Sequence, residues 1–211
     1  MNTHPGQHSL RRGLYAITPD EADTGRLLDR VEVVLSAGAT WLQYRHKAAT
    51  EKLRHEQASA LRALCGVYGV PLIINDDWRL AAEIGADGAH LGEDDGELTM
   101  ARHALGRDAL LGASCYDDMA LANGAVENGA SYVAFGAFFA SPTKPHARRA
   151  APALLGDAGA LGVPRVAIGG ITPDNARPLI DAGADLLAVI SGVFDAPDPA
   201  AATRAYLACF P

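Results

Sequence analysis

Residues 165–174 read RVAIGGITPD, and this stretch shows how the whole chain is built. A short apolar run ends at two glycines. Thr172 and Pro173 then have the pattern of a helix N-terminus, with a capping hydroxyl followed by a proline in the first turn. The stretch therefore predicts a strand, a tight turn and a helix in immediate succession.

The same succession recurs about eight times along the chain. The predicted strands cover residues 14–18, 41–45, 72–76, 88–91, 110–114, 132–136, 165–169 and 186–191. The predicted helices cover residues 23–37, 50–69, 77–84, 97–105, 117–128, 149–161, 174–181 and 198–209. The strand runs are nearly continuous in hydrophobicity, which is typical of parallel strands covered on both faces.

Eight alternations favour one fold, a single-domain α/β barrel of the (β/α)8 type over residues 13–211, with residues 1–12 as a flexible N-terminal arm. The alternative is an open, doubly wound sheet. That fold predicts a glycine-rich dinucleotide fingerprint after the first strand, where this chain has Thr18-Pro19-Asp20. In a barrel the carboxyl ends of all strands meet at one rim, where barrel enzymes carry out their chemistry.

The overall composition excludes several classes of function. A net charge of −7 argues against general nucleic-acid binding, which needs a basic face. No apolar stretch approaches the length of a membrane span, and the three widely spaced cysteines form neither a disulfide framework nor a metal-binding pair. We expect a cytoplasmic protein that acts on small molecules, and the sequence leaves its oligomeric state open, a homo-oligomer included.

Cationic and amide side chains follow the second predicted strand. Gln43, Arg45 and Lys47 alternate to the same side, and together they suit a phosphate or diphosphate group. The alternative is a surface patch of salt bridges. Lys144 and Lys52 are the only other lysines, and Lys144 also follows a strand, so we expect Lys47 and Lys144 to have specific roles.

Acidic side chains follow the third and fourth predicted strands, in Asn75-Asp76-Asp77 and in residues 92–95. Because neighbouring parallel strands lie about 4.8 Å apart, carboxylates from the two strand ends can meet at one Mg²⁺ ion together with substrate phosphate oxygens. Helix capping by Asp77 and Asp94 is the alternative reading, and we expect it for at least one of them. These residues alone do not choose between Asp94 and Asp95 as a metal ligand.

The remaining polar clusters also follow strands. They are Ser114 after the fifth strand, Ser141-Pro142-Thr143-Lys144 after the sixth, Gly169-Gly170 after the seventh and Ile190-Ser191 after the eighth. Hydroxyl groups and glycine-rich turns at these places suit anion binding, although tight turns without a ligand would look the same. The histidines at 46, 90, 103 and 146 lack metal-ligand spacing, and we interpret them as surface or packing residues.

Taken together, the phrases YAITPD, QYRHK, PLIINDD, GADGAHLGEDD, FASPTK and VAIGGITPDN resemble the thiamine phosphate synthase family. They occur in the family's order across roughly residues 13–195. The resemblance implies an Mg²⁺-dependent transferase that joins a pyrimidinylmethyl diphosphate to a thiazole phosphate, or to its carboxylate, through a pyrimidine carbocation. Thiamine phosphate and diphosphate would be the products.

The resemblance also implies a role for individual residues. Gln43, Arg45, Lys47 and Asn75 would hold the diphosphate, and Asp76 and Asp95 would hold Mg²⁺. Ser114 and Lys144 would contact the pyrimidine diphosphate, and with Arg45 and Lys47 they are the expected catalytic residues. The thiazole phosphate would lie against Ser141, Pro142, Thr143, Gly170, Ile190 and Ser191.

Three positions depart from the commoner family pattern, namely Glu93, Ser141 and Cys115-Tyr116, and they affect fine contacts more than the reaction. One alternative is a related thiazole tautomerase, which has no use for a diphosphate–magnesium site. A second is a non-catalytic barrel that binds thiamine phosphate, and a third is another phosphate-binding barrel isomerase. The non-catalytic barrel would not need the metal-binding carboxylates that this chain has. The isomerase would not need an arginine and a lysine side by side.

Overall fold

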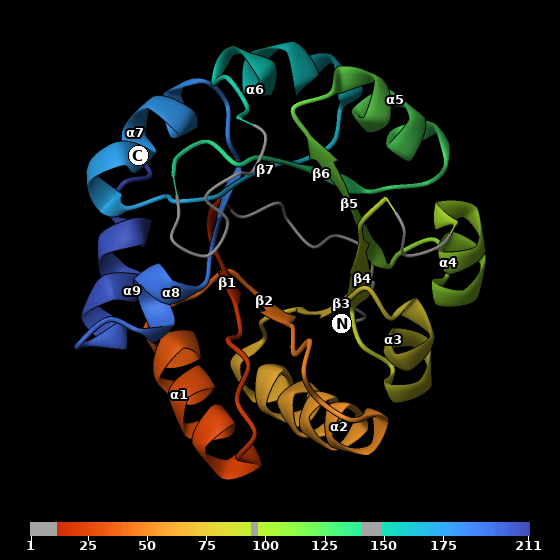
Figure 1. The fold of residues 1–211 in the computed structure, drawn as a ribbon, viewed down its shortest axis with the longest axis vertical. Helices are drawn as coiled ribbons and strands as arrows, with labels where there is room; N and C mark the ends of the chain where they lie inside the picture. Colours follow the sequence, from red (N-terminus) through yellow and green to blue (C-terminus); the bar gives the residue numbers. More distant parts are fainter. Residues whose placement is uncertain (1–11, 94–96, 141–148) are drawn as a thin grey trace, which may run out of the picture.

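The computed structural model describes residues 12–93, 97–140 and 149–211. Its eight strands are parallel and form a closed barrel in sequence order, with β8 (Leu186–Val189) paired to β1 (Gly13–Ile17). Figure 1 looks down this barrel and shows the helices arranged around its outside. The prediction of a (β/α)8 barrel is confirmed.

The elements follow one another as the sequence predicts. The other strands are β2 (Trp41–Tyr44), β3 (Leu72–Asn75), β4 (Gly88–Leu91), β5 (Leu110–Tyr116), β6 (Tyr132–Phe135) and β7 (Arg165–Ile168). The helices are α1 (Thr24–Ser36), α2 (Glu51–Tyr68), α3 (Trp78–Ile84), α4 (Leu98–Leu105), α5 (Met119–Glu127), α6 (Ala153–Asp157), α7 (Pro173–Asp181), α8 (Ser191–Phe194) and α9 (Pro199–Leu207).

Two elements differ from the sequence prediction. The helix expected at 149–161 is only α6 followed by a 3-10 turn, Ala158–Leu161, in a segment where Gly156 and Gly159 lower helix propensity. The four-residue helix α8 was not predicted, because one turn is too short to show a hydrophobic period.

Two apolar layers hold the barrel together. One fills its interior and includes Tyr15, Trp41 and Tyr132, whose rings meet edge to face. The other lies between strands and helices and includes Leu42 and Tyr44. Alternate residues of β2 thus enter different layers, and all four are buried, which explains the unbroken apolar runs in the sequence.

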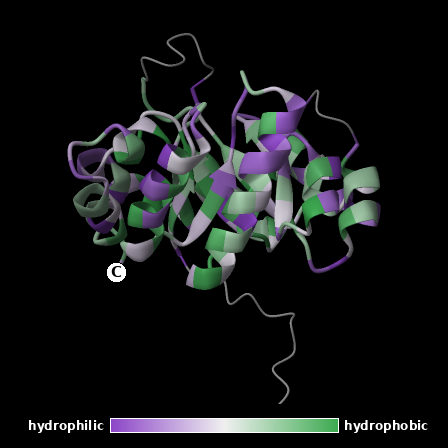
Figure 2. Ribbon diagram, turned by 90° about the horizontal axis from the view of Figure 1, so that it is seen from below, coloured by the Kyte–Doolittle hydropathy of each residue, from purple (hydrophilic) through white to green (hydrophobic). Residues whose placement is uncertain are grey.

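The helices bury one face each. In α1 the buried residues are Leu27, Val31, Val34 and Leu35, at helical spacing. The side view in Figure 2 accordingly shows hydrophobic and hydrophilic residues on the same helices. Among the helices in the described ranges, none has the length and hydrophobicity needed to cross a membrane.

The predicted helix boundaries rest on identifiable caps. Thr172 and Asn175 form a capping box at the start of α7, with Pro173 in its first turn. The carboxylate of Asp77 accepts from the amide of Leu80, at 2.9 Å, and so caps α3. The capping role expected of Asp77 is therefore confirmed, whereas Asp94 lies outside the described residues.

Gly112 in β5 allows close packing against Tyr132 in the barrel interior. A methyl group added at Gly112 would overlap the ring of Tyr132. We expect Gly112→Ala to lower the free energy of unfolding by about 2 kcal/mol, because an overfilled core must distort. The matched control is Gly124→Ala in α5, where the added methyl group meets nothing. It should stabilise by roughly 0.5–1 kcal/mol, and equal urea midpoints for the two variants would contradict this packing.

Candidate functional site

The predicted site residues within the described ranges lie at one end of the barrel. They occupy or directly follow the carboxyl ends of β2, β3, β5, β7 and β8, namely Gln43, Arg45, Lys47, Asn75, Asp76, Ser114, Gly170, Ile190 and Ser191. We call this end the carboxyl rim. Five further predicted residues, Asp95, Ser141, Pro142, Thr143 and Lys144, lie outside the described residues, so their placement stays a prediction.

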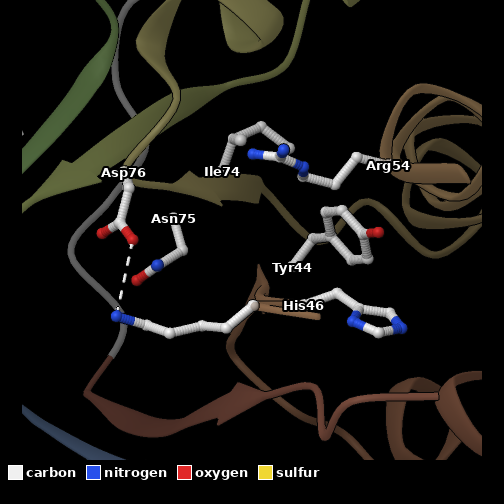
Figure 3. Close-up of a pocket in the computed structure, with 7 residues that line it drawn as sticks. Tyr44, His46, Arg54, Ile74, Asn75 and Asp76 are labelled. Atoms are coloured by element: carbon white, nitrogen blue, oxygen red, sulfur yellow. Dashed lines mark ion pairs between the residues drawn. The ribbon is translucent and has the colours of Figure 1, made fainter. Parts of the chain in front are cut away.

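Lys47 and Asp76 come together from adjacent strands. Lys47 Nζ lies 3.8 Å from Asp76 Oδ2, and the dashed line in Figure 3 marks this ion pair. Both residues border a pocket of about 170 Å³ with Tyr44, His46, Arg54, Ile74 and Asn75. The pocket opens between β2, β3 and α2, so it reaches only one side of the carboxyl rim.

Asp20, in the loop after β1, contacts both predicted cationic residues that follow β2, the guanidinium of Arg45 and the backbone amide of Lys47. Its Oδ1 accepts from the amide of Lys47 at 3.1 Å and lies 3.5 Å from Arg45 Nη1. Thr18 and Arg45 also exchange two hydrogen bonds, since Thr18 Oγ1 accepts from the Arg45 amide at 2.9 Å and donates to its carbonyl at 3.0 Å. These contacts keep Arg45 and Lys47 at the carboxyl rim.

A tight turn presents the carboxylate of Asp76. Its φ angle is +65°, a left-handed conformation that Asp and Asn adopt more readily than most residues. The Asp77 amide donates to the carbonyl of Asn75 and the Asp76 amide to the carbonyl of His90, both at 2.8 Å. The strand therefore ends sharply. The carboxylate of Asp76 lies at the carboxyl rim beside Lys47, whereas that of Asp77 caps α3.

Of the two residues expected to bind Mg²⁺, Asp76 lies within the described residues and Asp95 does not. Asp76 offers the hard carboxylate oxygens that Mg²⁺ prefers, and its pairing with Lys47 shows that it faces the charged part of the rim. Within the described ranges no group of three or more His, Cys, Asp or Glu side chains could hold a metal ion. Mg²⁺ is commonly bound by one or two carboxylates plus substrate phosphates, and the carboxylate of Asp76 is compatible with such a site.

Residues 138–140, which follow β6, pack against the carboxyl end of β7. The amides of Phe138 and Phe139 donate to the carbonyls of Ile168 and Gly169, at 3.2 and 2.9 Å. Gly170 has a φ of +63°, and a Cβ there would collide with the carbonyl oxygen of Ala140. Residues 138–140 therefore run along the end of β7 and lie against Gly170. Ser191, at the end of the adjacent β8, begins α8.

Inside the barrel, polar side chains are connected by hydrogen bonds that the sequence analysis did not predict. Tyr15, Gln43, His90 and Tyr132 are all buried, and they connect to Ser114 by hydrogen bonds. Burial raises the pKa of both tyrosines well above the ordinary value of 10.0, so they stay protonated. The sequence did contain a signal for these residues, namely polar residue types at strand positions that face inwards. A search for apolar periodicity does not detect it.

A buried carboxylate fixes the loop that carries Asp20. Arg26 Nε and Nη2 each donate to Glu21 at 2.6 Å, and the Asp23 amide donates at 3.0 Å. The Glu21 carbonyl accepts from Gln57 Nε2 of α2 at 2.8 Å. The hydrogen bonds from Arg26, followed by that from the Asp23 amide, lower the pKa of Glu21 from 4.5 to about 2.

With this geometry in place, comparison with known proteins decides the family. The profile of the thiamine monophosphate synthase family matches residues 14–193. The chain belongs to this family. A thiamine-phosphate synthase of Xanthomonas campestris pv. campestris is 59% identical over 199 residues, which cover 94% of this chain and 96% of the relative. One of Xylella fastidiosa is 54% identical over 202 residues, covering 96% and 86%.

A solved structure agrees with the sequence relatives. Thiamine phosphate pyrophosphorylase from Pyrococcus furiosus matches with a TM-score of 0.82 and 32% identity, covering 93% of this chain and 94% of the other. The family resemblance drawn from the short sequence phrases is thus confirmed. The tautomerase, the non-catalytic binding protein and the other isomerase find no support in these comparisons.

The low pKa of Glu21 predicts how stability depends on pH. Because its folded-state pKa lies below the ordinary 4.5, the carboxylate stabilises the fold above pH 4.5, and this stabilisation is lost as the pH falls towards 2. Glu21→Gln should therefore be less stable than wild type at pH 6, and the difference should shrink steadily between pH 4.5 and 2. Urea unfolding at several pH values measures it, and a difference independent of pH would contradict the assignment.

Proposed function

We propose that this protein joins a pyrimidinylmethyl diphosphate to a thiazole phosphate, or to its carboxylate, and releases thiamine phosphate and diphosphate. The observation that carries the proposal is the meeting of Lys47 and Asp76 at 3.8 Å on adjacent strand ends. A cation and a metal-binding carboxylate side by side suit a diphosphate that arrives with Mg²⁺. Family membership supports the same reaction.

The chemistry needs charge neutralisation more than proton transfer. The bond between the pyrimidine methylene carbon and the diphosphate oxygen breaks, and its electron pair leaves with the diphosphate. Arg45 and Lys47, with Ser114 and Lys144 as the sequence predicts, would stabilise the negative charge that accumulates there. Asp76 and Asp95 would hold Mg²⁺, which supplies further positive charge to the diphosphate when it is bound.

The second half of the reaction forms the new carbon–nitrogen bond. The pyrimidine carbocation is stabilised by its own aminopyrimidine ring, and the thiazole nitrogen donates its free lone pair to the methylene carbon. No strong general base is required. Ser141, Pro142, Thr143, Gly170, Ile190 and Ser191 would hold the thiazole phosphate, a role that the position of Gly170 and Ser191 at the ends of β7 and β8 supports.

We also propose a cytoplasmic location, since all three cysteines are free thiols, as is usual in a reducing compartment.

The proposed reaction can be tested directly. Purified protein is mixed with Mg²⁺ and both substrates, and the product is oxidised to a fluorescent thiochrome. Fluorescence that appears only with both substrates, and that EDTA abolishes, would support the proposal. Absence of product from the folded protein would refute it.

The two neighbouring aspartates provide a matched test of the metal site. Asp76→Asn keeps a residue that tolerates positive φ but removes the charge, and we expect turnover to fall about a hundredfold. Asp77→Asn is the control, because Asn caps a helix as well as Asp does, and it should keep near wild-type turnover. Equal rates for the two variants at saturating Mg²⁺ would exclude a special role for Asp76.

The lysines provide a second matched test. Lys47→Gln removes a cation at the carboxyl rim and should lower turnover about a hundredfold, as loss of one charge aimed at a leaving group does. Lys52→Gln removes an equal charge from an exposed position on α2 and should leave turnover unchanged. A loss of similar size in both variants would point to a general charge effect and contradict the proposal.

A further inference from the structure

Five side chains form one hydrogen-bonded chain across the barrel interior. Gln43 Nε2 donates to Tyr15 Oη at 2.8 Å, and Tyr15 Oη lies 2.9 Å from Tyr132 Oη. Tyr132 Oη lies 3.0 Å from His90 Nδ1, and His90 Nε2 lies 2.9 Å from Ser114 Oγ. We call this set, from Gln43 to Ser114, the interior chain. It draws on β2, β1, β6, β4 and β5.

The donor and the acceptor of each hydrogen bond in the interior chain follow from the number of protons that each side chain can donate. Tyr15 Oη accepts from Gln43, so its own proton has one recorded acceptor among the described residues, Tyr132 Oη. Tyr132 then accepts from Tyr15, and its own proton goes to His90 Nδ1. Reversing either tyrosine while Gln43 donates would leave a buried hydroxyl proton unpaired, which is costly.

This direction determines the state of His90. With Nδ1 accepting, the neutral imidazole carries its proton on Nε2 and donates it to Ser114 Oγ. The side chain is also held in place, since the His90 ring stacks on Tyr132 at 5.5 Å between centroids and Trp41 meets Tyr132 edge to face. Only Ser114, at the open end of the interior chain, is partly exposed.

We propose that His90, aligned by Tyr132, Tyr15 and Gln43, is a positioning residue that turns Ser114 into a hydrogen-bond donor towards the diphosphate. Because Ser114 Oγ accepts from His90, its own proton is directed outwards, to an oxygen of the bound anion. The inference rests on the proposed function for the identity of that anion. It assigns a role to Tyr15, His90 and Tyr132, three buried side chains that are not among the residues of the carboxyl rim.

The protonation state is tested in the wild-type protein, without any substitution. Histidine labelled with ¹⁵N distinguishes protonated from unprotonated ring nitrogens, and the signal of His90 is assigned by its loss in His90→Gln. We expect a proton on Nε2 and none on Nδ1 near neutral pH. A proton on Nδ1 and none on Nε2 would mean that Ser114 donates to His90 instead, with the Gln43 amide turned round. That result, or protons on both nitrogens near neutral pH, would overturn the inference.

Kinetics then test whether the contact matters. His90→Asn places an amide near the former Nδ1 but has no donor at the Nε2 position, and should lower kcat about tenfold to a hundredfold, with the KM for the thiazole phosphate unchanged. His90→Gln restores a donor near Nε2 and should recover most of that loss. His55→Asn, at an exposed position on α2 paired with Glu83, is the control and should behave as wild type.

A double-substitution cycle separates positioning from general damage to the fold. In a Ser114→Ala background, His90→Asn should lower kcat by less than about twofold further, because the group it positions is already gone. Fully multiplicative losses, or wild-type kinetics in His90→Asn, would overturn the inference. An inactive wild-type protein would instead refute the proposed function, and the state of His90 would still be read from its ¹⁵N signals.

Discussion

The pairing of β8 with β1 is the constraint on which the rest depends. Residues 13–16 lie opposite 186–189, and this contact turns an open parallel sheet into a closed wall with a defined inside. Closure leaves no unpaired sheet edge and brings eight strand ends to a common rim. Residues as distant in sequence as Lys47 and Ser191 then lie at the same end of the molecule. The closed barrel places them there, and their own segments need not touch.

Closure also explains why polar groups can occupy the interior. A barrel of eight strands leaves a core just wide enough for side chains, so an inward-facing polar group can also find a partner on a strand that does not pair with its own. Tyr15 and Tyr132 meet in this way, at 2.9 Å between their hydroxyl oxygens. Fully paired, such groups rigidify a core; unpaired, they would destabilise it.

Much of this architecture could be predicted from the sequence, because each strand is a continuous apolar run and each helix has a readable boundary such as Thr172-Pro173 or Asp77. The charged residues Arg45, Lys47 and Asp76 were found for the same reason: they interrupt hydrophobicity at a strand end. The contact of His90 with Tyr132 could not be found, since sequence spacing does not reveal which inward-facing side chains of unpaired strands meet inside a closed barrel. Helix α8 was missed because one turn has no period, and the roles of Asp95 and Lys144 remain predictions from resemblance.

The left-handed backbone at Asp76 also bears on how this position can evolve. Its φ of +65° is tolerated by Gly, Asn and Asp and opposed by nearly every other side chain. Asn and Gly codons are each one nucleotide away from those of Asp, so the accessible mutations that spare the backbone all abolish the charge. The carboxylate at position 76 can therefore be lost by a single nucleotide change that leaves the turn after β3 and the barrel intact.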